Sequence, residues 1–129
     1  MSQREADIKK VILKWLNLNG ILSFPVRTTG TPNPRGKGFI PLQVKGISDI
    51  LGIIPPPKRF SQFGGIPLAV EVKRPGGKLT IHQKVFLDDW NKAGGLGFVA
   101  NSLDIVIKTL NPYLTFNQEV PFQSPIGGG

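Results

Sequence analysis

Cysteine is absent from this 129-residue sequence, and histidine occurs once, as His82. Without cysteine the chain cannot form a disulfide scaffold, a thiolate zinc site or a thiol nucleophile. A single histidine excludes any metal site that needs two or more imidazole ligands. No apolar run approaches the roughly 18 residues of a membrane span, and the charged start, MSQREADIKK, is unlike a signal peptide. We therefore expect a soluble protein of the cytoplasm.

Acidic residues are scarce relative to basic ones. The chain has 8 Asp and Glu residues against 16 Lys and Arg residues, which gives a net charge of +8 and an isoelectric point near 10.1. Such an excess favours a polyanionic partner, most commonly nucleic acid, although a merely soluble basic surface is the alternative. No block of five or six like charges occurs, so we expect the positive charges to be spread over a folded surface.

The chain has the length of one domain. Hydrophobic residues make up 40% of it, which is enough for a core, and its 16 Gly and 12 Pro residues predict several long loops. Three segments have the apolar spacing of amphipathic helices: 3–18, 80–93 and 103–110. The pairs Ser2–Glu5 and Thr80–Gln83 match the capping-box pattern at the starts of the first two helices.

Four segments are rich in strand-forming residues: 21–27, 46–54, 66–74 and 96–100; residues 39–44 could add a short strand. Pro25 indicates that the first of them lies at a sheet edge. Segments 28–38 and 55–65 have the composition of turns and are expected to be loops. The element order α-β-β-β-α-β-α predicts an α/β domain over residues 1–112, with a mixed sheet flanked by helices. Residues 113–129 are expected to form a partly flexible, extended C-terminal arm or tail.

One predicted strand carries an acid and a base side by side. Glu71 and Lys73 are two residues apart, so they project from the same face as the small Ala69. A central strand rarely accommodates two charges unless they are paired or used. An E-x-K pattern by itself, however, also fits an edge strand whose charges face solvent.

A second acid lies within another predicted strand. Asp49 precedes Glu71 by 22 positions with a loop between them, so antiparallel pairing of the two strands could bring these carboxylates together. Neighbouring carboxylates repel each other, and a divalent cation removes that repulsion. Hard oxygen ligands of this kind suit Mg²⁺ or Mn²⁺. Lys73 would point toward the same place and could stabilise charge that develops on a phosphate oxygen.

The motifs around these residues occur in a definite order. They are G-I-S-D-I-L-G at 46–52, A-V-E-V-K-R-P-G-G-K-L-T at 69–80 and G-G-L-G-F-V-A-N-S-L-D at 94–104, with Gln83 between the last two. Over about residues 5–110 the chain therefore resembles the virus-type replication-repair nuclease (VRR-NUC) family of the PD-(D/E)XK nuclease superfamily. The resemblance implies a restriction-endonuclease-like fold and a metal-dependent DNA endonuclease.

The resemblance also implies roles for individual residues. The implied catalytic residues are Asp49, Glu71, Gln83, Glu5 and the catalytic lysine, Lys73. Asp49 and Glu71 would bind one or two Mg²⁺ or Mn²⁺ ions together with the backbone carbonyl of Val72. Glu5 and Gln83 are also the third residues of the two predicted capping boxes, so a purely structural role is the alternative for both.

Basic residues near the motifs and in the predicted loops are candidates for contacts to DNA phosphates. They are Arg27, Arg35, Lys37, Arg74, Lys78, His82 and Lys84. Each of them taken singly also fits a solvated surface charge, and a lone histidine at a helix start is commonly no phosphate ligand. As a set they predict salt-sensitive binding that is independent of base sequence.

The predicted function is a metal-dependent DNA endonuclease, with Holliday junctions or other branched DNA as one substrate class and repair or recombination as its process. Resemblance to junction resolvases of the same superfamily implies a homodimer with two sites, because a four-way junction has paired strands to cut. Two alternatives remain open. One is a less selective nuclease that nicks or trims DNA ends, and the other is a non-catalytic nucleic-acid-binding module on the same fold. The resemblance is compatible with a virus- or mobile-element-encoded protein.

Overall fold

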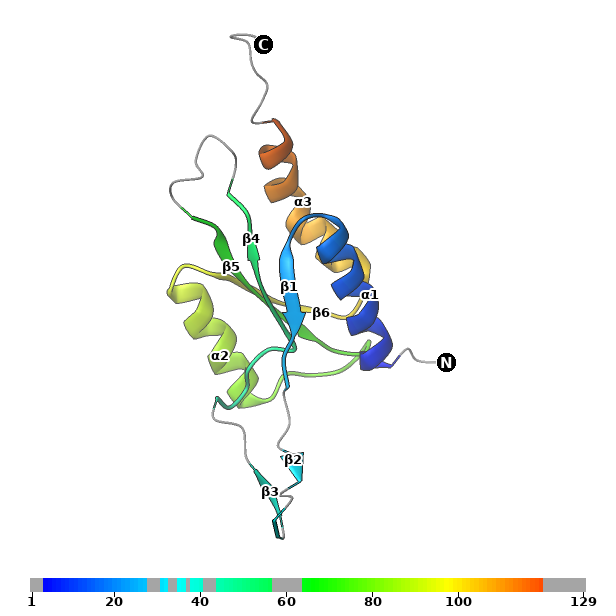
Figure 1. Ribbon diagram of the computed structural model, residues 1–129, viewed down its shortest axis with the longest axis vertical. Helices are drawn as coiled ribbons and strands as arrows, with labels where there is room; N and C mark the ends of the chain where they lie inside the picture. Colours follow the sequence, from blue (N-terminus) through cyan, green and yellow to red (C-terminus); the bar gives the residue numbers. More distant parts are fainter. Residues whose placement is uncertain are drawn as a thin grey trace.

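The computed structural model describes residues 4–27, 31–32, 35–36, 38–40, 44–56 and 64–119. In chain order the elements are α1 (Glu5–Leu18), β1 (Leu22–Pro25), β2 (Thr31–Pro32), β3 (Phe39–Ile40), β4 (Ile50–Ile54), β5 (Ile66–Val72), α2 (Ile81–Lys92), β6 (Leu96–Ala100) and α3 (Leu103–Glu119) (Figure 1). The helices and the four strands of the main sheet follow one another as α-β-β-β-α-β-α, which confirms the predicted α/β class. No helix within the described ranges combines the length and the apolar character needed to cross a membrane.

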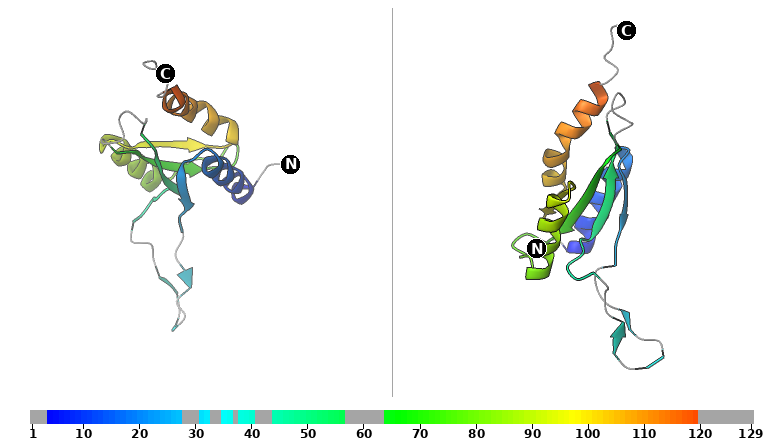
Figure 2. Two further views of the ribbon diagram at one scale, coloured as in Figure 1. Left: turned by 45° about the horizontal axis from the view of Figure 1, so that its top comes forward. Right: turned by 90° about the vertical axis from the view of Figure 1, so that its left-hand side faces the viewer.

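The main sheet is mixed, with the strand order β1-β4-β5-β6. β1 pairs antiparallel with β4, β4 pairs antiparallel with β5, and β5 pairs parallel with β6. β1 is therefore an edge strand, as Pro25 predicts. Proline has no backbone N–H to donate to a neighbouring strand, so within sheets it is found at edges. β2 and β3 form a separate antiparallel ribbon that extends away from the main sheet (Figure 2).

Helices cover both faces of the sheet (Figure 1). α1 and α3 enclose the main core on one face. This core contains Ile8, Ile12 and Leu16 of α1, Ile50 and Ile54 of β4, Leu68, Val70 and Val72 of β5, and Val106, Leu110 and Leu114 of α3. α2 packs on the other face, where a Cβ added to Gly97 would lie 3.0 Å from Leu87 and 3.7 Å from Ala69. Side chains alternate along β5, so Glu71 shares this second face with Ala69.

The first helix begins at Glu5, two residues later than predicted. Arg4 is its N-cap, and no side-chain hydrogen bond caps it. Glu5 is therefore the first helical residue and not the third, so its predicted place in a capping box is wrong; Ser2 lies outside the described residues.

The capping box of α2 is confirmed. Thr80 Oγ1 accepts from the Gln83 amide at 3.1 Å, and the Thr80 amide donates to Gln83 Oε1 at 2.9 Å. These two bonds fix the start of α2 at Ile81.

The last helix is longer than the sequence predicts. α3 continues past Leu110 to Glu119 with Pro112 inside it, so the expected extended conformation is wrong as far as Glu119. Proline removes one helical hydrogen bond, but Leu114 on the next turn is buried in the core, and this burial favours the helical path. Residues 120–129 of the predicted arm lie outside the described residues.

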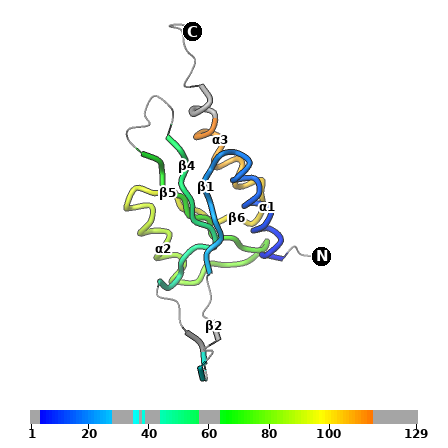
Figure 3. Tube along the Cα trace, in the orientation of Figure 1, coloured from blue at the N-terminus to red at the C-terminus, as the bar shows by residue number. Residues whose placement is uncertain are grey.

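Two further boundaries differ from the prediction. The predicted strand 46–54 begins only at Ile50, so Asp49 lies one residue before β4 and not within it. The predicted loop 28–38 contains the short strand β2. The Cα trace shows that the first turns of α1 and α2 and the carboxyl end of β1 lie toward one end of the molecule (Figure 3). The candidate site lies at this end.

Candidate active site

Asp49 and Glu71 face each other across two neighbouring strands. The antiparallel register pairs Ile50 with Val70. One further step along both strands places Asp49 opposite Glu71, where the Cβ atoms of such pairs are typically about 4.5–5.5 Å apart. The antiparallel pairing expected from the sequence thus brings the two acids together.

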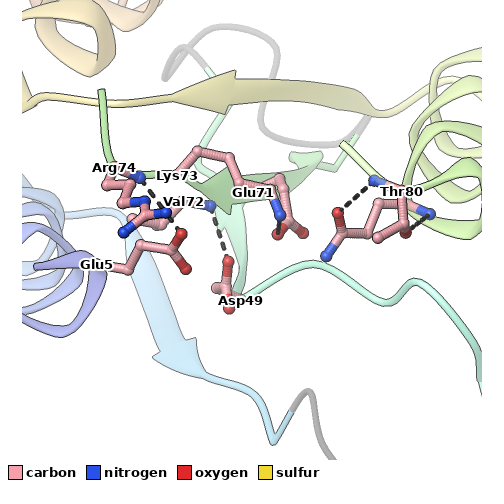
Figure 4. Close-up of polar contacts among 8 residues, drawn as sticks. Glu5, Asp49, Glu71, Val72, Lys73, Arg74 and Thr80 are labelled. Carbon is pink, nitrogen blue, oxygen red and sulfur yellow. Dashed lines mark hydrogen bonds and ion pairs between the residues drawn. The ribbon is translucent and has the colours of Figure 1, made fainter. Parts of the chain in front are cut away.

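The carboxylate of Asp49 is held by the end of β5. Its Oδ2 atom accepts a hydrogen bond of 2.8 Å from the amide of Val72 (Figure 4). Behind it, the Asp49 carbonyl accepts from the amide of Val26 at 2.8 Å, which fixes the backbone. In a strand the amide and the carbonyl of one residue point to the same side. The carbonyl of Val72 is therefore directed to the side on which Asp49 lies.

Glu71 is a buried carboxyl group with an unsatisfied oxygen. Its side chain is only 3% exposed, and its Oε1 atom has no hydrogen-bond partner. The pKa of Glu71 is raised to about 8, chiefly by burial and in addition by repulsion from the nearby carboxylate of Asp49. The ammonium group of Lys73 opposes this shift in pKa only in part. Lys73 therefore does not neutralise the combined negative charge of Asp49 and Glu71.

Lys73 lies beside Glu71, as the alternation along the strand predicts. The Lys73 Nζ atom is 3.8 Å from Glu71 Oε2, and its side chain is 13% exposed. This loose ion pair uses one oxygen of Glu71 and leaves Oε1 without a partner. The ammonium group therefore lies near the carboxylates and near any anion bound beside them.

The oxygen atoms gathered here fit a hard divalent cation. The carboxylates of Asp49 and Glu71 and the carbonyl of Val72 are ligands of the kind that Mg²⁺ and Mn²⁺ prefer. Within the described ranges no group of three or more His, Cys, Asp or Glu side chains is placed to hold a metal. Two carboxylates completed by water and substrate oxygens are typical of Mg²⁺, which keeps several waters. The unpartnered Glu71 Oε1 supplies the position that a cation would satisfy.

Glu5 approaches the same place from α1. Its Oε2 atom accepts from the amide of Arg74, just beyond the end of β5, at a long 3.4 Å. Glu5 also contributes, as the smallest of the causes, to the raised pKa of Glu71. An open pocket of about 200 Å³ separates the first turns of α1 from the strand ends; it is lined by Glu5, Ala6, Lys9, Asp49 and Val72.

Gln83 lies in the first turn of α2. Its side-chain oxygen is engaged by Thr80, so the structural role is present whatever else the residue does. The segment that precedes Asp49 packs against this turn of α2 at Gly46. A Cβ added to Gly46 would overlap the carbonyl of His82 and lie 2.6 Å from the amide of Gln83, and Gly46 has a φ of 77° that favours glycine.

Most of the basic candidates are exposed at or near this end of the molecule. The exposed ones are Arg27, Arg35, Arg74, Lys78, His82 and Lys84. Arg27 follows Val26, whose amide donates to the carbonyl of Asp49, so the backbone of Arg27 lies near Asp49 in space. Arg35 lies in the connection between β2 and β3, whereas Lys37 lies outside the described residues. Contacts of these residues to DNA remain a prediction.

Sequence reasoning missed two residues that shape the site. Lys9 lines the pocket beside Glu5, and Gly46 sets the approach of the chain to Asp49. The spacing of four residues between Glu5 and Lys9, which places both on one helix face, was the signal for the first. No sequence signal locates the helix turn against which Gly46 packs.

Comparison with known proteins gives one family. Residues 41–104 match the VRR-NUC domain, and the match spans Asp49, Glu71, Lys73 and Gln83. It leaves out α1, from which Glu5 and Lys9 come. No curated protein and no solved structure matches the chain significantly.

Proposed function

Because the chain belongs to the VRR-NUC family, a family of nuclease-type domains, we propose that it is a metal-dependent endonuclease that hydrolyses phosphodiester bonds in DNA. One observation carries the proposal. The buried Glu71, opposite Asp49, keeps its Oε1 atom without a hydrogen-bond partner, while Lys73 Nζ lies 3.8 Å from the other carboxylate oxygen, Oε2. A structural ion pair would satisfy that oxygen, whereas a cation-binding site requires it to be available.

The carboxylates of Asp49 and Glu71 and the carbonyl of Val72 would hold one or two Mg²⁺ or Mn²⁺ ions. When bound, such an ion neutralises the carboxylates, polarises the phosphate and lowers the pKa of a bound water. The hydrogen bond from the Val72 amide keeps the Asp49 carboxylate oriented throughout. The neutral form that burial favours for Glu71 gives way to the ionised form when positive charge is supplied.

Lys73 supplies the charge that meets the phosphate. Its ammonium group is held beside Glu71 and can stabilise negative charge that develops on the phosphate oxygens, or orient the attacking water. Glu5, on the opposite wall of the pocket, would accept a hydrogen bond from a water at the site, and Gln83 would contribute from α2. Water attacks the phosphorus directly, so no covalent enzyme intermediate forms.

DNA would be held by the exposed basic side chains and by the net charge of +8. These contacts are expected to be independent of base sequence and to weaken steeply with salt. Such a nuclease would act in the cytoplasm, in DNA repair or recombination.

Branched DNA, including four-way junctions, is the proposed substrate class, and a homodimer the proposed assembly. An apolar patch on the edge strand supports a second copy as partner: Leu22 and Phe24 of β1 and Ile53 of β4 are exposed. Leu22 pairs with Ile53 in the register, so these two side chains lie on the same face of the sheet. Light scattering of the purified protein at several concentrations tests the dimer.

Cleavage of a substrate panel tests the proposed function. Duplex, single-stranded, flapped and four-way DNA are incubated with Mg²⁺, Mn²⁺ or EDTA. We expect metal-dependent cleavage that is lost in Asp49→Asn and kept in Asp88→Asn, which removes an exposed acid of α2. DNA binding should survive both changes. If the native protein binds these substrates but cuts none with either metal, the chain is a non-catalytic binding module.

A further inference from the structure

The pocket beside Asp49 contains a lysine with no assigned role. Glu5 and Lys9 lie four residues apart on α1 and therefore on one face of the helix. Ala6 also lines the pocket on the side of α1, and Asp49 and Val72 line it on the side of the strands. Lys9 is partly buried in this position, whereas its neighbour Lys10 is exposed.

The charge of Lys9 is uncompensated by direct contacts. Among the described residues, ion pairs join Lys73 to Glu71 and Lys108 to Asp104. Lys9 thus takes part in neither, although the acids Glu5 and Asp49 line the same pocket. Of the two lysines at the site, Lys73 is engaged with a carboxylate and Lys9 is available for an external anion.

An anion that enters this pocket needs such a group. Two acids in the lining would repel a phosphate diester, and a lysine among them offsets the repulsion and offers three N–H donors. Lysine acts as a compact point charge on a flexible stem, which suits it to a phosphate oxygen that changes position as the bond breaks. The second lysine also lies opposite Val72, the residue whose carbonyl faces the candidate cation.

We propose that Lys9 is a substrate-binding residue whose ammonium group contacts a non-bridging oxygen of the DNA phosphate to be cleaved and holds it against Asp49 and Val72. The inference rests on the proposed nuclease function and adds a contact from α1, outside the residues that match the family. The site then takes its phosphate-binding charge from two elements, Lys73 at the end of β5 and Lys9 on α1.

The test compares Lys9→Ala and Lys9→Gln with Lys10→Ala. Lys10 follows Lys9 directly but points about 100° away around the helix axis, so Lys10→Ala removes the same charge from the same helix without touching the pocket. We expect kcat/KM for DNA cleavage to fall about 10- to 100-fold in both Lys9 variants, as for the loss of a charged hydrogen bond. Lys10→Ala should stay within about threefold, and Lys9→Arg should recover most of the activity.

Two further measurements separate substrate binding from a structural role. The midpoint of thermal unfolding in EDTA and the rise of that midpoint with Mg²⁺ are recorded for each variant. A lysine that only neutralises Glu5 and Asp49 would, when removed, destabilise the fold in EDTA and strengthen the Mg²⁺ effect at unchanged kcat. If Lys9 binds the substrate, we expect kcat to fall in the Lys9 variants. The unfolding midpoint in EDTA and its rise with Mg²⁺ should then stay close to those of the native protein.

The outcomes distinguish the two proposals. If the native protein cleaves DNA and the Lys9 variants match Lys10→Ala, the role of Lys9 is overturned and the nuclease function stands. If the native protein cleaves no DNA with either metal, the nuclease function is overturned, and the role of Lys9 with it. Should Lys9→Ala fail to fold, the polar, uncharged Lys9→Gln gives the same comparison.

Discussion

The amide of Val72 donates a 2.8 Å hydrogen bond to Asp49 Oδ2, and this bond joins the last residue of β5 to the residue that precedes β4. It orients one carboxylate of the site without using a side chain. The other carboxylate, Glu71, receives no comparable support and keeps a buried, unpartnered oxygen. One acid is thus fixed in place while the other is held in an unfavourable environment, a difference that can be measured.

Asp49→Asn should stabilise the protein in the absence of divalent cations. The amide oxygen of asparagine can still accept from Val72, but the charge that repels Glu71 is removed. We expect the free energy of unfolding at pH 8 in EDTA to rise by about 1 kcal/mol, the value of one unit of pKa. Urea denaturation measures it, with Asp88→Asn as the surface control. An unchanged or lower stability would contradict the repulsion between the two acids.

Glu71 should make stability depend on pH in an unusual direction. Burial and Asp49 raise its pKa in the folded protein from 4.5 to about 8. Between these values the folded state binds more protons than the unfolded state, so the free energy of unfolding falls as pH rises. The stabilisation is complete below about pH 4.5 and is lost as pH rises through about 8, with a total on the order of a few kcal/mol.

Urea denaturation in EDTA between pH 5 and 9 checks this dependence. The difference between the native protein and Glu71→Gln isolates the contribution of one group, since every other titrating residue is common to both. Mg²⁺ should reverse the trend in the native protein, because a cation favours the ionised carboxylate and stabilises the folded state by mass action. Parallel curves for the two proteins in EDTA would show that Glu71 has an ordinary pKa.

Lys73→Ala should abolish most activity while leaving the fold intact. The ammonium group is loosely paired with Glu71, so its loss breaks no tight bond, but a phosphate bound at the proposed site would lose the positive charge beside Glu71. We expect kcat to fall by about 10²–10⁴, the range for one electrostatic contact in a transition state. The rise in the unfolding midpoint with Mg²⁺ should persist. Lys92→Ala, at the exposed end of α2, is the control, and native turnover by Lys73→Ala would remove Lys73 from the mechanism.

Gly46→Ala should destabilise the protein and displace Asp49. A Cβ there overlaps the carbonyl of His82, and the φ of 77° disfavours any side chain. Gly76 is a matched control, because it has a φ of 83° but nothing within 4 Å of an added Cβ. Gly76→Ala should cost about 1 kcal/mol of strain, and Gly46→Ala at least about 2 kcal/mol together with lost cleavage. Equal losses in both variants would mean that the contact with α2 is unimportant.

The sequence predicts the central part of the site well, because that part depends on local rules. Alternation along a strand places Glu71 and Lys73 on one side, and the loop between two strand segments favours the antiparallel pairing that brings Asp49 to Glu71. The capping box of α2 is likewise a local pattern of two residues three positions apart, and it forms as expected.

The α1 side of the site could not be predicted in the same way. The S-x-x-E pattern at Ser2 and Glu5 favours a helix start that the fold does not use, since the Glu5 carboxylate is turned to the amide of Arg74, 69 positions away in the sequence. The pocket lined by Lys9 exists only because α1 docks near the ends of β4 and β5. At the other end of the chain, burial of Leu114 outweighs the helix-breaking tendency of Pro112.

Gln83→Ala separates a catalytic contribution of Gln83 from its role in the capping box. The substitution removes one of the two reciprocal bonds, the one from the Thr80 amide to Gln83 Oε1. Thr80→Ala removes the other, from the Gln83 amide to Thr80 Oγ1, and leaves the glutamine side chain in place. Both variants should lose about 0.5–1 kcal/mol of stability, the usual effect of a lost cap. If Gln83 takes part in cleavage, Gln83→Ala loses at least about tenfold in kcat, a barrier change of about 1.4 kcal/mol, while Thr80→Ala stays within a few-fold of the native rate. Equal activity in the two variants would assign Gln83 to the helix cap alone.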